Sequence, residues 1–263
     1  MTNQAQISLV PVKKIVGRGQ GAFQLTIQAP PGDYADPGIF AKLRVLKGEF
    51  PLLDRPFSVH RFSPQTGELD FLFRVVGQGT EALAQCQPGD LIQITGPLGQ
   101  GLLALDPNFA QKPIYLVAGG IGLAPMASLL QSQKEPATLF YGERLGQSLI
   151  DRDYINSWAP GFLATSEDGL GYGEKGRVTD LLTKALAEEK RNIFACGPIG
   201  LLAALSPLAK AHGVKYYASA EAFMACGLGV CLSCSRLTLD QTRLRLCQDG
   251  PTIDGLNFDW NKP

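Results

Sequence analysis

This sequence of 263 residues has no excess of positive or negative charge, because its 24 basic residues are balanced by 24 acidic ones. No basic stripe is present, which argues against a nucleic acid as partner. No apolar run reaches the ~18 residues needed to cross a bilayer, so we expect no membrane span. The first residues, Met1 to Gln6, lack the charged and then apolar build of a signal peptide. We therefore expect no leader.

Cysteine and histidine are also scarce. Four of the six cysteines lie close together near the C-terminus, which leaves only Cys86 and Cys196 for a disulfide. A disulfide framework is therefore not expected, and a cytoplasmic location fits the chain. No acid–base constellation stands out: we interpret His60 as an ordinary strand side chain and His212 as structural.

The four clustered cysteines have the spacing of a plant-type [2Fe–2S] site. Cys226, Cys231 and Cys234 form a C-x4-C-x2-C run, and Cys247 follows after twelve residues. Glycines in the first gap let the backbone curl so that its N–H groups point at the sulfurs. The alternative is a structural zinc knot, which also uses four thiolates but usually pairs two C-x2-C motifs. The spacing therefore predicts a [2Fe–2S] cluster, a one-electron carrier, on these four residues.

The hydrophobic pattern before residue 96 predicts an antiparallel β-barrel. Several short segments alternate apolar and polar residues, as half-buried antiparallel strands do, and closing them into a barrel removes the exposed edges. The expected strands span residues 7–16, 22–28, 41–46, 57–62, 69–76 and 90–95, with a short helix at 80–86.

From Pro113 onward, buried strands alternate with helices, which is the pattern of βαβ units and a parallel sheet. We expect strands at 114–118, 137–141, 162–165, 192–195 and 215–220, and helices from about 123, at 178–189 and at 198–212. The predicted fold class is an α+β multi-domain protein. Its parts are an antiparallel β-barrel domain at 1–106, an α/β parallel-sheet nucleotide domain at 107–219 and a small C-terminal iron–sulfur domain at 220–263. The tail after Pro251 receives no assignment.

A glycine-rich turn in the second part is a candidate dinucleotide site. Gly120 and Gly122 lie between a strand and a helix, where the backbone can approach a phosphate at the helix terminus. Pro125 replaces the last glycine of the Rossmann fingerprint. Glu143, 21 residues after Gly122, is placed to bind a ribose hydroxyl, whereas Arg144 suits a 2′-phosphate. The sequence leans to NAD over NADP, and a tight turn without a ligand is the alternative.

A second edge of the same site is expected at Cys196, Gly197 and Pro198, which end a later strand. Ligands of open α/β sheets bind at the carboxyl ends of strands, so Cys196 is placed to face a nicotinamide ring, with clearance from Gly197. An inert buried thiol is an equal alternative. The loop at 165–169 ends another strand and either contacts the same dinucleotide or is a solvated turn.

The barrel region contains a candidate flavin site, the run Arg55, Pro56, Phe57 and Ser58. The arginine suits a pyrophosphate, the phenyl ring suits a flavin ring, and the serine suits the polar edge of that ring. In the alternative interpretation the phenylalanine is merely core. The turn at 77–80 opens the short helix and offers N–H groups to a second phosphate.

Together these motifs resemble the ferredoxin-reductase superfamily. The motifs are Arg55-Pro-Phe-Ser, Gly79-Thr80, Gly119-Gly-Ile-Gly with Pro125, and Cys196-Gly-Pro. The C-terminal run Met224-Ala-Cys-Gly-Leu-Gly-Val-Cys-Leu-Ser-Cys and Cys247-Gln-Asp-Gly-Pro narrow the match. Over almost its whole length the chain is similar to the electron-transfer subunits of the heteromeric NAD-dependent dihydroorotate dehydrogenase.

That resemblance implies three redox cofactors: the [2Fe–2S] cluster on the four cysteines, NAD in the middle domain and FAD in the barrel. It implies that FAD is bound by Arg55, Pro56, Phe57, Ser58, Leu72, Phe73, Arg74, Gly79 and Thr80. Electrons would pass from the cluster through FAD to NAD+, because a flavin exchanges both single electrons and hydride. Phe57 occupies the motif position at which many reductases of the superfamily have a tyrosine.

Dihydroorotate oxidation would then belong to a separate FMN-containing barrel subunit of ~250 residues, as part of pyrimidine biosynthesis. The implied assembly is a heterotetramer with two copies of each chain. An apolar contact with that partner is expected from Phe223, Met224, Leu228, Val230 and Leu232.

Two other functions use the same residues. The first is an NAD(P)H-dependent reductase subunit that serves a hydrogenase, an oxygenase or a transhydrogenase. Related transhydrogenase subunits tend to have aspartate as the first cluster ligand, so Cys226 argues against that branch. The second is a non-enzymatic nucleotide sensor with structural zinc.

Overall fold

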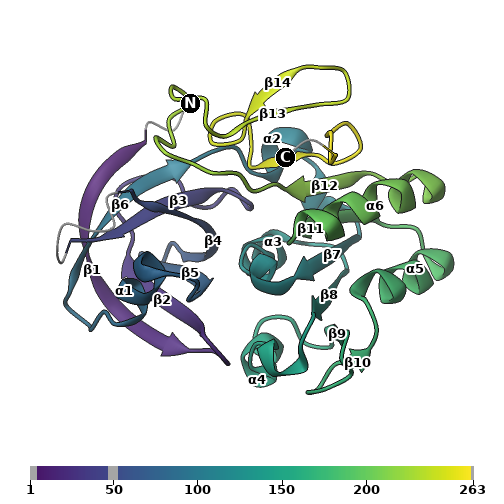
Figure 1. Cartoon of the computed structure of the whole chain (residues 1–263), viewed down its shortest axis with the longest axis horizontal. Coiled ribbons are helices and arrows are strands. Elements are labelled where there is room, and N and C mark those ends of the chain that lie inside the picture. The colour runs from purple at the N-terminus through teal and green to yellow at the C-terminus, as the bar shows by residue number, and fades with distance from the viewer. Residues whose placement is uncertain (1–4, 47–52, 262–263) are drawn as a thin grey trace.

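The computed structural model describes residues 5–46 and 53–261. Figure 1 shows a barrel, an α/β unit beside it and a small C-terminal unit in yellow at one end of both. The prediction that the chain has no leader was argued from residues 1–6. Residues 1–4 lie outside the described residues. No helix within the described ranges is long and apolar enough to cross a membrane.

Six antiparallel strands close into the expected barrel in the order β1-β2-β5-β4-β3-β6. Their side chains alternate between two environments, as the hydrophobic pattern predicts. On β5, Leu69, Phe71 and Phe73 fill the barrel, whereas Leu72 packs toward the α/β unit. Helix α1 (Gln78–Ala84) leads from β5 toward β6. The strands are β1 (Gln6–Gly17), β2 (Ala22–Gln28), β3 (Phe40–Val45), β4 (Arg55–Ser63), β5 (Glu68–Arg74) and β6 (Leu91–Leu98).

The second part is a seven-stranded sheet in the order β10-β9-β8-β7-β11-β12-β15. The strands from β7 to β12 pair in parallel, and β15 is antiparallel to β12. The fold class predicted from the sequence is confirmed. The strands are β7 (Ile114–Gly119), β8 (Ala137–Glu143), β9 (Leu163–Ser166), β10 (Glu174–Lys175), β11 (Asn192–Cys196), β12 (Tyr216–Ser219) and β15 (Thr252–Asp254).

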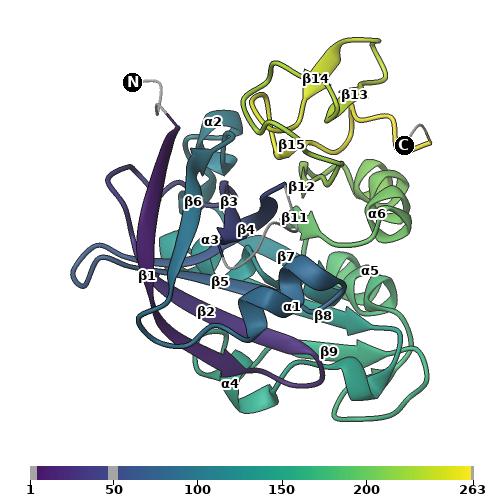
Figure 2. The same ribbon diagram turned by 60° about the vertical axis from the view of Figure 1, so that its left-hand side comes forward.

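Strand β7 is apolar throughout because both faces of the sheet are covered. Tyr115 and Val117 pack on the side of α5 (Val178–Glu188) and α6 (Ile199–His212). Ile114, Leu116 and Ala118 pack on the other side, with α3 (Met126–Ser132). Figure 1 shows α3 between the sheet and the barrel, and Figures 1 and 2 show α5 and α6 on the side of the sheet that faces away from the barrel. The expected helix from about residue 123 begins instead as a 3-10 turn (Gly120–Leu123) before α3.

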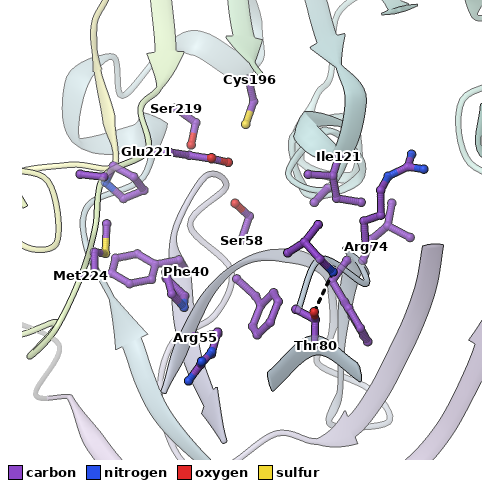
Figure 3. Close-up of a pocket in the computed structure, with 18 of the residues that line it drawn as sticks. Phe40, Arg55, Ser58, Arg74, Thr80, Ile121, Cys196, Ser219, Glu221 and Met224 are labelled. Atoms are coloured by element: carbon purple, nitrogen blue, oxygen red, sulfur yellow. Dashed lines mark hydrogen bonds between the residues drawn. The ribbon is translucent and has the colours of Figure 1, made fainter. Parts of the chain in front are cut away.

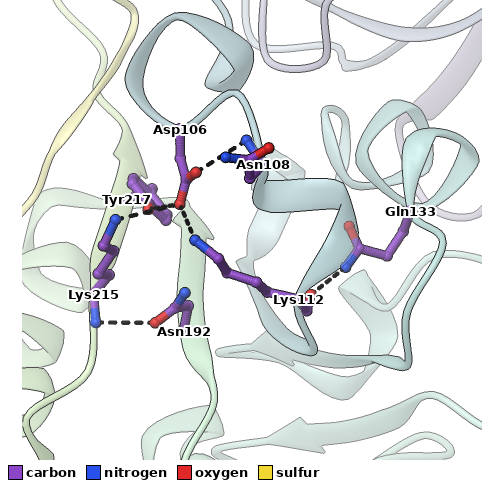
Figure 4. A network of polar contacts seen from close by, with 7 residues as sticks. All are labelled: Asp106, Asn108, Lys112, Gln133, Asn192, Lys215 and Tyr217. Atoms are coloured by element: carbon purple, nitrogen blue, oxygen red, sulfur yellow. Dashed lines mark hydrogen bonds and ion pairs between the residues drawn. The ribbon is translucent and has the colours of Figure 1, made fainter.

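The segment that joins the two parts is fastened by a buried carboxylate, Asp106 (Figure 4). It follows the short helix α2 (Leu102–Leu105) and precedes the 3-10 turn η1 (Phe109–Gln111). The Tyr217 hydroxyl donates to it at 2.8 Å, and the ammonium groups of Lys112 and Lys215 lie at 3.3 and 3.4 Å. Burial works against the charged form, but these hydrogen bonds lower the pKa of Asp106 to about 2. The link is therefore held to the sheet at β12.

His60 on β4 connects the barrel to the α/β unit and is more than an ordinary strand side chain. Its ring is fully buried, with Nδ1 at 2.6 Å from the Ala124 carbonyl oxygen and Nε2 at 2.6 Å from the Tyr154 hydroxyl of α4 (Arg152–Asn156). A carbonyl can only accept, so Nδ1 carries the hydrogen and the tyrosine donates to Nε2. Burial lowers the pKa of His60 to about 4, which keeps the ring neutral.

The C-terminal unit consists of the cysteine loop and a hairpin, β13 (Ser235–Leu237) and β14 (Arg243–Arg245). The chain then returns to the large sheet, where Ile253 of β15 pairs with Ala218 of β12. The tail after Pro251, which the sequence left unassigned, thus ties the cysteine unit to the nucleotide sheet.

Candidate functional site

A cavity of about 290 Å³ lies where the barrel, the sheet and the cysteine unit meet. Figure 3 shows side chains from all three parts around it. The barrel contributes its strands β4 and β5, the sheet contributes the end of β11, and Met224 comes from the segment before the cysteine loop. Nine of the residues that the sequence assigned to a cofactor line this cavity: Arg55, Pro56, Phe57, Ser58, Leu72, Phe73, Arg74, Thr80 and Cys196.

The Arg55 end of the cavity suits a phosphate group. A Cβ atom added to Gly79 would lie 2.5 Å from Nε of Arg55, so the missing side chain makes room for the guanidinium beside the first turn of α1. The Thr80 hydroxyl accepts hydrogen bonds from the N–H groups of Val76 and Gly77, at 2.9 and 3.1 Å. These bonds shape the turn next to the arginine. A cationic side chain beside a fixed turn fits the pyrophosphate of FAD.

The other end suits a flat ring with a polar edge. Phe57 packs against Phe73 and Phe71, with ring centroids 5.6 and 6.4 Å apart, and also borders the cavity. It is therefore both core and cavity wall. Ser58 points toward Glu221, which extends from the opposite wall (Figure 3). The apolar faces and the hydroxyl fit an isoalloxazine ring.

Cys196 is buried and also lines the cavity, and its place opposite a nicotinamide ring stays a prediction. Burial raises the pKa of its thiol, which stays protonated at neutral pH. Glu221 was missed by the sequence reasoning. Its side chain is exposed to the cavity, yet its carboxyl is surrounded by enough protein to raise its pKa. The position just after β12 was the available signal, because ligands bind at the carboxyl ends of sheet strands.

A second cavity, of about 920 Å³, opens at the carboxyl ends of the parallel strands. A cavity of this size has room for an extended dinucleotide. It therefore favours the dinucleotide interpretation of the glycine turn over a tight turn without a ligand. Gly122 is buried and is not among the residues that line this cavity, and a Cβ atom on it would collide with the carbonyl oxygen of Cys196. The turn after β7 and the turn after β11 are thus in direct contact. Predicted residues that line this cavity are Gly120, Glu143, Arg144, Thr165, Glu167, Asp168 and Pro198.

Two residues that the sequence assigned to different ligands bind each other. Arg74 borders the first cavity and Glu143 the second, and their side chains form an ion pair of 2.8 Å. The Tyr141 hydroxyl also donates to Glu143, at 2.9 Å. Burial raises the pKa of Glu143, and Arg74 opposes that effect. This ion pair is a direct polar connection between the two cavities.

The cysteine loop presents its sulfurs in two pairs. Cys226 and Cys231 are near enough to influence each other's pKa, and so are Cys234 and Cys247. In the described part of the chain, no three Cys, His, Asp or Glu side chains are grouped closely enough to hold a single metal ion. Two thiolates for each of two irons is the arrangement that a [2Fe–2S] cluster needs.

Backbone N–H groups also point at the sulfurs, as the glycines of the loop predict. Leu228 donates to Cys226 Sγ at 3.3 Å, and Gly229 donates to Cys247 Sγ at 3.1 Å. A hydrogen bond with the Ser233 hydroxyl, 3.2 Å away, lowers the pKa of Cys231 to about 6. The thiolate, the form that binds metal, is thereby favoured at this position.

Two family models match the chain. The iron–sulfur cluster binding domain of dihydroorotate dehydrogenase B matches residues 221–259, and the oxidoreductase NAD-binding domain matches residues 116–206. The electron transfer subunit of dihydroorotate dehydrogenase B (NAD(+)) from Desulforamulus reducens is 35% identical over 86% of this chain and 87% of its own length. The chain belongs to this family of electron transfer subunits.

A second member of the family, from Clostridium acetobutylicum, is 34% identical over 89% of this chain and 90% of its own length. A solved structure described as an NADH-dependent reduced ferredoxin-NADP oxidoreductase, studied for flavin-based electron bifurcation, superposes with a TM-score of 0.81. It is 28% identical to this electron transfer subunit and covers 97% of this chain and 91% of its own.

These matches confirm the family that the sequence motifs indicated, together with its iron–sulfur and NAD-binding parts. The described flavin chemistry of the solved structure agrees with FAD as the third cofactor. The roles of individual side chains remain predictions.

Proposed function

We propose that this protein carries electrons from a dihydroorotate-oxidising partner, through a [2Fe–2S] cluster and FAD, to NAD+. The observation that supports this most directly is the meeting of the barrel, the sheet and the cysteine unit at one cavity, around Ser58, Cys196 and Met224. A flavin held there exchanges single electrons with a cluster and hydride with a nicotinamide. No residue of the chain is required as a general base.

Side chains of the first cavity have distinct tasks in this proposal. Arg55 holds the flavin pyrophosphate beside the turn at Thr80, and Phe57 with Ser58 orients the ring. Cys196 and Glu221 border the place where the nicotinamide meets the flavin. Because the Cys196 thiol is protonated, it adds no negative charge where hydride leaves. The glycine turn around Gly120 carries the dinucleotide phosphates.

The partner docks on an apolar surface next to the cluster loop, formed by Phe223, Leu228, Val230 and Leu232. Their exposed fractions are 90%, 50%, 76% and 55%, which is unusual for neighbouring large apolar residues. Met224, expected in the same contact, also lines the first cavity. We propose an FMN-containing barrel subunit as partner, two copies of each chain, and a cytoplasmic location. None of the six cysteines, all of which the structure describes, forms a disulfide, and this supports that location.

The division of labour is tested by anaerobic reduction of the purified, cofactor-loaded protein. Dihydroorotate alone should leave the flavin absorbance unchanged, and dihydroorotate with the catalytic partner should bleach it and produce NADH from NAD+. Bleaching without the partner would contradict the proposal. A protein that lacks both iron and acid-labile sulfide would contradict it as well.

A second candidate function is a reductase subunit of the transhydrogenase kind, which the likeness to the ferredoxin-NADP oxidoreductase favours. Cys226 argues against it, because related transhydrogenase subunits tend to have aspartate at the position of this first ligand. Rapid flavin reduction by NADPH, with no coupling to a dihydroorotate-oxidising partner, would favour this second function.

A further inference from the structure

Lys42 on β3 is a buried cation that faces the cysteine loop. Its exposed fraction is 4%, although lysine is almost never fully buried without a charged partner. Its ammonium donates to the carbonyl oxygen of Ala225 at 2.6 Å and lies 3.4 Å from that of Cys226. No aspartate or glutamate in residues 5–46 and 53–261 forms an ion pair with it.

The loop is shaped to accept this side chain. A Cβ atom on Gly227 would lie 2.8 Å from Cδ of Lys42, and the backbone of Gly227 has a φ of +75°, which favours glycine. The aliphatic stem therefore runs directly under the residue that follows the first cluster ligand. Lys42 is also the register partner of Pro56 on the adjacent strand β4, which carries the run Arg55 to Ser58. One residue thus joins the flavin strand to the cluster loop.

Burying an unpaired charge is costly unless something nearby compensates it. Two carbonyl oxygens offer only partial charges. A cluster of two ferric ions, two sulfides and four thiolates is an anion, and an added electron makes it more negative. A buried ammonium beside the carbonyl of Cys226 therefore has its natural counter-charge in the cluster, and more so after reduction.

We propose that Lys42 is a positioning residue that fastens the cluster loop to the barrel and raises the reduction potential of the cluster. This inference rests on the proposed function, because it requires a [2Fe–2S] cluster on the four cysteines. Replacement by methionine keeps the length and removes the charge, so the oxidised cluster should become favoured. The equilibrium between the reduced and the oxidised cluster should shift about tenfold toward the oxidised form, which lowers the midpoint potential of the cluster by about 59 mV.

The test is an anaerobic redox titration of the cofactor-loaded protein, followed by the electron paramagnetic resonance signal of the reduced cluster. Wild type, K42M and K42R are compared with K13M, which removes an exposed charge from the outside of the barrel. We expect a lower midpoint in K42M, and wild-type midpoints in K42R and K13M. Iron and sulfide are counted in every sample.

The outcomes separate the possible failures. A wild-type midpoint in K42M overturns the role of Lys42 and leaves the proposed function standing. If K42M loses its cluster, retention by K42R supports the inference, and loss from K42R as well overturns it. A wild-type protein without iron and sulfide overturns the proposed function itself.

Discussion

Mild acid should loosen the junction between the barrel and the sheet through one side chain, His60. Burial of the ring lowers the pKa of His60 from 6.5 to about 4 in the folded protein. The unfolded chain therefore takes up a proton first as the pH falls, and the folded state loses stability from about pH 6.5 down to about pH 4. One pKa unit corresponds to about 1.4 kcal/mol, so the full loss is about 3 kcal/mol. About 2 kcal/mol of it falls between pH 7 and pH 5.

The measurement compares urea unfolding of the cofactor-loaded protein at about pH 7 and about pH 5, in wild type and in H60Q. Glutamine has no proton to gain, so the difference between the two free energies of unfolding should shrink by about 2 kcal/mol in the variant. The comparison uses a pH difference, so any loss of stability that is independent of pH cancels. An unchanged difference in H60Q would show that His60 is not held neutral.

Three further substitutions test the sites. G122A places a methyl group against the Cys196 carbonyl, so the affinity for NADH, measured by titration, should fall at least tenfold; unchanged affinity would mean that the contact of the two turns is not needed. G79V displaces the Arg55 guanidinium, and FAD should bind about tenfold more weakly, or ~1.4 kcal/mol, by flavin fluorescence. Equal FAD affinity would remove Arg55 from the pyrophosphate site. C226S should keep FAD and lose coupled turnover with the partner, and normal coupling would exclude Cys226 as a ligand.

Regular periodicity made most of the fold predictable from the sequence. The strand expected at 22–28 coincides with β2 (Ala22–Gln28), and the apolar run at 114–118 with β7. Alternation along a strand and the continuous apolar character of a covered strand are local signals. Helix α4 gave no such signal, because its five residues do not complete two turns. Strand β15 was missed because its partner β12 lies more than thirty residues away along the chain.

The sites were predictable where a short motif fixes them, as for the cysteines and Arg55 to Ser58. They were not predictable where distant segments meet. Lys42 and Ala225 are 183 residues apart, and Arg74 and Glu143 are 69 residues apart. No local pattern marks a strand lysine as a neighbour of a cysteine loop. Such contacts become visible only when the whole fold is known.

The three parts of the chain are joined by buried polar contacts as well as by apolar packing. His60 joins the barrel to the sheet, Asp106 joins the linking segment to β12, and Lys42 joins the barrel to the cysteine loop. Apolar surfaces can slide with little change in energy, whereas a hydrogen bond weakens steeply when its atoms separate or turn. Electron transfer between cofactors in different parts requires a fixed arrangement. We therefore infer that these contacts set the relative positions of the flavin, the dinucleotide and the cluster.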